Sequence, residues 1–178
     1  DGGIFQMKFE RGKTVESLKR IGDSKKTGTK VRFMADSEIF ETTNYDYETL
    51  EKRFKETAFL TKGLYISIED KREEETKKAE FCYEGGLTEY VQMLNKNKNP
   101  IHENIVDISG FENDISIEVA LQYNDTYNSN IYSFVNNIIT PEGGTHEDGV
   151  RRALTRILNK YGNSAGLLKN NDDPLTGE

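Results

Sequence analysis

Apolar residues that alternate with polar ones predict a series of strands along the chain. The clearest case is Ile115 to Tyr123, where an apolar residue recurs at every second position, as in a strand with one buried face. Similar or shorter patterns predict further strands at Ile4–Glu10, Thr29–Phe33, Leu64–Asp70, Thr76–Tyr83, Ile105–Phe111 and Ile131–Ile138. Charged or glycine-containing segments between these strands are expected to be hairpin turns.

Three segments have the helical period instead. Asp46 is placed to cap a helix over Tyr47–Leu60, and a shorter helix is expected to begin at Leu87. A long helix is expected to begin after Thr145, its N-cap, and to run to Tyr161. Its apolar residues recur with the spacing of one buried face: Val150, Leu154, Ile157, Leu158 and Tyr161. Hairpins with a few helices between them predict an α+β fold, with helices layered against one sheet.

A Gly-rich turn precedes the long helix. Gly143 and Gly144 allow an abrupt change from strand to helix, and Thr145 is placed as the N-cap with Asp148 reaching back in a capping box. His146 is interpreted as a hydrogen bonder that fixes the turn. Free backbone N–H groups here could also bind an anion, but a tight, capped turn is the favoured interpretation.

Charge narrows the possible partners. The 178-residue chain has a net charge of -7, so any contact with nucleic acid has to come from a local basic surface. Four basic residues of the long helix could provide one, or could simply form a solvated face: Arg151, Arg152, Arg156 and Lys160. The absence of a long apolar run predicts no membrane contact, and the single cysteine, Cys82, fits a reducing cytoplasm.

Catalytic chemistry is not indicated. The chain has two histidines and one cysteine without the spacing of a metal site, and it has no arrangement typical of a nucleophile and its base. The segment Ser24–Thr29 lacks the spacing of a phosphate-binding loop, so it is interpreted as a charged hairpin tip. We therefore predict no catalytic residue and no metal ligand.

Three long segments carry a resemblance to a known family. They are LNKNKNPIHENI (94–105), VALQYNDTYNSNIYSFVNNI (119–138) and EGGTHEDGVRRALTRILNKY (142–161). Together they resemble the ATPase region of the B subunits of bacterial DNA gyrase and topoisomerase IV, and the resemblance extends from about Lys26 to Glu178. Pro100-Ile101-His102 is more similar to gyrase than to topoisomerase IV.

The resemblance implies a division of the chain into two parts. Residues 1–45 would be the C-terminal strands of an incomplete GHKL-type ATP-binding domain. Residues 46–178 would be a transducer domain similar to ribosomal protein S5 domain 2, truncated at its C-terminal end. Both ends look cut, so the chain is expected to be a piece of a larger protein.

The resemblance also implies a function for the whole B subunit. The family couples ATP binding and hydrolysis to closure of a clamp and passage of DNA, acting as an isomerase that introduces negative supercoils or, in topoisomerase IV, decatenates DNA. Its cofactors are ATP and Mg²⁺, and its partners are DNA, the gyrase A subunit and a second copy of the ATPase region. The family's catalytic motifs are absent from this sequence, so the chain alone is expected to be inactive and to bind neither cofactor.

In this family, basic residues of the transducer face the cavity through which DNA passes. The position of Arg151 matches an arginine of the family, and Arg152 and Arg156 are expected neighbours. Two other classes stay open: a non-catalytic module that binds a protein partner, and a phosphotransfer or hydrolase domain that uses the Gly-rich turn. The latter lacks a base, a nucleophile and a metal set.

Overall fold

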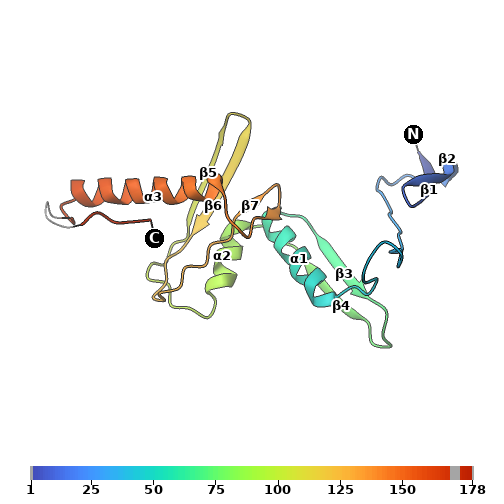
Figure 1. The fold of residues 1–178 in the computed structure, drawn as a ribbon, viewed down its shortest axis with the longest axis horizontal. Coiled ribbons are helices and arrows are strands. Elements are labelled where there is room, and N and C mark those ends of the chain that lie inside the picture. Colours follow the sequence, from blue (N-terminus) through green and yellow to red (C-terminus); the bar gives the residue numbers. More distant parts are fainter. Residues whose placement is uncertain (1, 169–172, 178) are drawn as a thin grey trace. The chain divides into compact units, whose positions relative to one another are not determined.

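The computed structural model describes residues 2–168 and 173–177, and its elements are drawn in Figure 1. The chain forms two compact units, Asp1–Tyr45 and Asp46–Glu178. The assignment of the first unit to an ATP-binding domain and of the second to a transducer stays a prediction.

The first unit is built on one antiparallel hairpin. Strands β1 (Gly3–Glu10) and β2 (Lys13–Asp23) are joined by Arg11 and Gly12, which both have positive φ (48° and 78°). The predicted strand at 4–10 is thus confirmed, but β2 was not predicted. Register shifts along the pair show why, because each irregularity interrupts the simple alternation that marks a strand in a sequence.

The strand predicted at Thr29–Phe33 is wrong. That segment has no regular secondary structure, and the side chains of Val31 and Phe33 are 78% and 75% exposed. A strand needs a neighbour for its backbone hydrogen bonds, and among the described residues the partner of β1 is β2.

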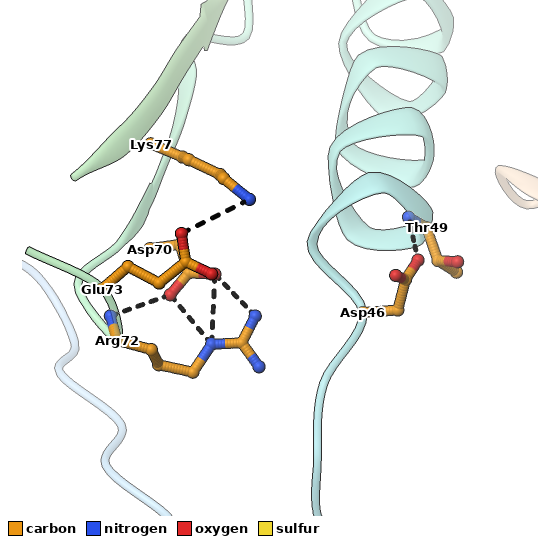
Figure 2. Close-up of polar contacts among 6 residues, drawn as sticks. All are labelled: Asp46, Thr49, Asp70, Arg72, Glu73 and Lys77. Atoms are coloured by element: carbon orange, nitrogen blue, oxygen red, sulfur yellow. Dashed lines mark hydrogen bonds and ion pairs between the residues drawn. The ribbon is translucent and has the colours of Figure 1, made fainter. Parts of the chain in front are cut away.

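The second unit begins with the elements that the sequence predicts best. They are α1 (Tyr47–Leu60), β3 (Ile66–Asp70), β4 (Lys77–Phe81) and α2 (Leu87–Asn95) (Figure 1). The carboxylate of Asp46 accepts a hydrogen bond of 2.8 Å from the backbone N–H of Thr49 (Figure 2), as expected of an N-cap. Hydrogen bonds from Thr49 are also the main cause that lowers the pKa of Asp46.

The tip of the β3–β4 hairpin is held by ionic contacts. Arg72 Nε donates to both carboxylate oxygens of Asp70, at 2.9 and 3.1 Å, and the Arg72 backbone N–H donates to the same carboxylate (Figure 2). The pKa of Asp70 falls to about 2, chiefly because of these hydrogen bonds from the side chain and backbone of Arg72. Lys77 and Glu73 form a looser pair at 3.9 Å. The predicted charged hairpin tip is therefore confirmed.

The remaining elements are β5 (Val106–Glu112), β6 (Ile115–Leu121), β7 (Phe134–Val135), β8 (Ile138–Ile139) and α3 (Thr145–Ser164). The hairpin of β5 and β6 was predicted. The single strand predicted at Ile131–Ile138 is wrong, because Asn136 and Asn137 adopt positive φ (50° and 63°) and turn the chain back on itself. Asparagine tolerates this conformation better than most residues, so the segment forms a two-residue hairpin turn.

Strand pairing follows the chain. In the part of the chain that the structure describes, the sheets are four separate antiparallel pairs: β1 with β2, β3 with β4, β5 with β6 and β7 with β8. The α+β composition was predicted, whereas the single shared sheet was not found among these residues. In the first half of the second unit, α1 packs against β3, β4 and α2.

The core of the second unit is aromatic. Ala58 and Phe59 of α1 are 0% and 2% exposed, and Tyr90 of α2 is 6% exposed. The ring of Phe59 stacks on Tyr83 with centroids 3.5 Å apart and on Tyr90 with centroids 5.0 Å apart. Burial, helped by the charge of Glu56, raises the pKa of Tyr90 to about 12.

Truncation of this core should destabilise the second unit strongly. We expect Phe59→Ala to lower the free energy of unfolding by about 3–5 kcal/mol, because it removes a buried ring and leaves a cavity. Phe111→Ala is the matched control: its ring is 73% exposed, so its cost should stay within about 0.5 kcal/mol. Urea denaturation followed by circular dichroism measures both, and equal losses would contradict the assigned core.

The Asp70–Arg72 contact should give the β3–β4 hairpin an acid-dependent stability. Because the folded-state pKa of Asp70 is lowered, its contribution is present above the unfolded pKa, near 3.8, and is lost as the pH falls towards about 2. Amide hydrogen exchange in β3 and β4 should therefore be faster in Asp70→Asn than in the wild type at pH 6. The two rates should converge near pH 2, and a difference that is independent of pH would contradict this origin.

Candidate functional site

The turn before α3 depends on two glycines. Gly143 and Gly144 have φ values of +69° and +151°, and the Gly143 N–H donates to the carbonyl of Thr140 at 2.9 Å. A Cβ at Gly143 would lie 3.1 Å from a carboxylate oxygen of Glu147. Positive φ and limited space together explain why glycine suits these positions.

The cap of α3 differs from the prediction. Gly144 is the N-cap, no side chain caps the helix, and Thr145 is already its first helical residue. The Asp148 backbone N–H donates to the Gly144 carbonyl at 3.0 Å, so it takes part in the first helical turn, and no capping box with Thr145 forms. The helix therefore begins one residue earlier than expected, since the two glycines place the last non-helical φ at 144.

A hydrogen-bonded network joins this turn to β7 and β8. The hydroxyl oxygens of Ser133 and Thr140 are 2.7 Å apart, and the Thr140 hydroxyl donates to the Ser133 carbonyl at 3.0 Å. Thr140 Oγ1 also lies 3.1 Å from His146 Nε2. His146 thus fixes the turn through a hydrogen bond, as its position suggested. Ser133 and Thr140 were not predicted, because they are seven residues apart and meet only through the hairpin.

Arg151 is held by Glu147. Its Nε and Nη2 atoms donate to one carboxylate oxygen, at 3.1 and 3.0 Å, while the other oxygen accepts a hydrogen bond of 3.0 Å from the Ser133 hydroxyl. Arg151 first and Ser133 second lower the pKa of Glu147. The four-residue spacing of Glu147 and Arg151 is the signal in the sequence that could have revealed this pair.

The network borders an open cavity of about 360 Å³. Ser133, Thr140 and Tyr132 line it, together with the charged residues Glu142, Glu147 and Arg151. The side chain of Arg151 is 38% exposed and that of Glu147 is 19% exposed. The arginine is therefore the more accessible member of the pair.

The other basic residues of α3 lie on its exposed surface. Arg152 and Arg156 are exposed, and neither has an ion pair within residues 2–168 and 173–177. The apolar stripe of α3 is less buried than predicted: Ile157 and Tyr161 are 59% and 62% exposed. The period predicted the helix correctly, but no described element covers the C-terminal part of this stripe.

His102 anchors a loop. Its Nε2 accepts from the Tyr123 backbone N–H at 2.9 Å, so its Nδ1, 2.6 Å from the Asn104 carbonyl, carries the proton. Its side chain is thus fully used in holding the segment after Pro100 against the end of β6.

Neither a metal site nor a membrane span is found among the described residues. They contain no group of three or more His, Cys, Asp or Glu that could hold a metal ion. None of their helices is long and apolar enough to cross a bilayer.

The fold matches those of the ATPase regions of DNA gyrase B and topoisomerase IV. The 43K ATPase domain of Thermus thermophilus gyrase B, solved with an aminocoumarin, superimposes with a TM-score of 0.83. The match has 30% sequence identity and covers 99% of this chain and 49% of that one. The expected α+β fold is confirmed.

Comparison with related sequences shows the family of this chain. The DNA gyrase B subunit of Staphylococcus epidermidis is 50% identical over 100% of this chain, and that of Bacillus cereus is 54% identical over the same extent. The chain spans 28% and 44% of the length of these two relatives. The model of the DNA gyrase B family matches residues 86–178, and the chain belongs to this family.

The observed cap and network can be separated by two substitutions. Thr140→Val should lower the free energy of unfolding by about 1 kcal/mol, because it removes a hydroxyl that makes three contacts. Thr145→Ala should change it by no more than about 0.5 kcal/mol, because Thr145 caps nothing. Thermal or urea unfolding measures both, and the reverse order would restore Thr145 as the N-cap.

Proposed function

We propose that this chain is part of the B subunit of an ATP-driven type II topoisomerase and couples the nucleotide state to movement of DNA. Residues 1–45 belong to the ATP-binding domain and residues 46–178 to the transducer. The observation that carries the proposal is the family match over residues 86–178, which includes the Gly-rich turn and the basic start of α3.

The cofactors and partners follow from that assignment. ATP and Mg²⁺ bind to other parts of the protein, which supply the hydrolysis. The partners are DNA, the gyrase A subunit and a second copy of the ATPase region, and the enzyme acts in the cytoplasm. The residues of this chain transmit the movement and contact DNA, and none of them takes part in ATP hydrolysis.

Hydrogen bonds support a transmitting role. Arg53 of α1 donates to the Asn137 carbonyl at 3.1 Å, and the Asn137 side chain donates to the Thr61 hydroxyl at 3.1 Å. The β7–β8 turn is thereby fixed to α1. At its other end the same hairpin is fixed to α3 through Ser133 and Thr140. A shift of α1 would therefore be passed to the start of α3.

The basic residues at the start of α3 make the DNA contact. Arg151 has guanidinium N–H groups left over from its pair with Glu147, and Arg152 and Arg156 are exposed. With a net charge of -7 on the chain, such a cluster provides a local phosphate contact without a general affinity for polyanions.

Arg151 should matter to DNA-dependent turnover. In the intact enzyme, Arg151→Ala should lower DNA-stimulated ATP turnover by about three- to fivefold, the size expected for loss of one partly exposed ionic contact. Turnover without DNA should change much less. Lys160→Ala removes a charge further along the same helix and serves as the matched control.

A loss of basal and stimulated turnover to the same extent would count against the DNA contact. Product analysis separates the family members: gyrase introduces negative supercoils, whereas topoisomerase IV decatenates. A non-catalytic interaction module would show no ATP dependence even in the intact protein.

A further inference from the structure

We propose that Glu147 is a positioning residue that orients Arg151 and partly neutralises its charge, so that the contact of Arg151 with DNA phosphate is kept weak. The inference rests on the proposed function, because it needs DNA as the ligand of Arg151. It concerns Glu147, for which no role in DNA contact was predicted from the sequence.

The first support is geometric. Both contacts of Arg151 use one edge of the guanidinium, because Nε and Nη2 donate to the same Glu147 oxygen. A guanidinium has five N–H groups. Nη1 makes no hydrogen bond to any described residue, and Arg151 lines the cavity. A phosphate oxygen can therefore bind at the free edge while the pair with Glu147 persists.

The second support is that Glu147 is itself fixed. Its second oxygen accepts from Ser133, and the Ser133 hydroxyl lies 2.7 Å from that of Thr140. Arg151 is therefore tied through one carboxylate to the β7–β8 hairpin as well as to its own helix. An ordinary ion pair on a helix surface lacks this second tie.

The third support is electrostatic. Arg151 would face DNA with a negative charge 3.0 Å from its Nη2 atom, so the pair as a whole is close to neutral. Glu142 adds a second acidic group to the cavity lining. A duplex that has to pass this surface and leave it again is served by a weak contact, because a strong one would retain it.

The test uses Glu147→Gln in the intact enzyme. Glutamine keeps the shape and the hydrogen-bonding capacity of the side chain but removes its charge. The DNA concentration that gives half-maximal stimulation of ATP turnover should fall by about two- to fivefold. The plot of log affinity against log salt should become steeper by up to about 0.9, the value for one further phosphate contact. Turnover without DNA is measured as the reference for the stimulation, and circular dichroism shows that the variant folds.

Asp148→Asn is the matched control, since it makes the same charge change in the same helical turn but Asp148 has no ion pair with Arg151. Its effect should be clearly smaller.

A double substitution decides the outcome. In an Arg151→Ala background, Glu147→Gln should have no further effect on DNA affinity, because the two residues act through one contact. An effect that persists there, or one that equals that of Asp148→Asn, overturns the inference. If Arg151→Ala alone leaves DNA stimulation unchanged, the proposed function fails, and that result is distinct from a failure of Glu147 only.

Discussion

The stacking of Phe59 on Tyr83 and Tyr90 is the contact on which the second unit depends. Phe59 belongs to α1, Tyr90 to α2, and Tyr83 follows β4, so one cluster joins three elements. Tyr90 also lies 6.0 Å from the ring of Tyr132 and 6.5 Å from that of Phe134, measured between centroids. The cluster thereby reaches the segment that leads to α3. Aromatic burial in a small core thus also positions the polar network that holds Arg151.

Local signals predicted the elements that local interactions determine. The bounds of α1 follow from its cap at Asp46 and its apolar period, and the structure has the same bounds. The β3–β4 and β5–β6 hairpins follow from alternating residues on either side of a charged or polar turn. In these elements the residues that are close in sequence are also close in space, so the local pattern is enough to predict the structure.

The wrong predictions concern contacts between residues that are far apart in the sequence, which a local pattern of apolar residues does not show. Val31 and Phe33 alternate like strand residues but have no partner strand in the described part of the chain. The stripe on α3 indicates which residues can be buried together, but not what covers them. At the site, Arg151 was proposed from the resemblance, whereas Ser133 and Thr140 approach Glu147 only after the β7–β8 turn has reversed the chain.

The electrostatics of α3 differ from those of the whole chain. A net charge of -7 repels DNA at long range, yet the segment Arg151–Arg156 of α3 contains three arginines. At about 0.15 M salt the screening length is about 8 Å, so distant acidic residues matter little to a phosphate that touches the helix. The nearest charges therefore dominate the electrostatic potential at such a phosphate, and Glu147 is 3.0 Å from Arg151. In the proposed DNA contact, the strength of binding is therefore set by charges within one helical turn.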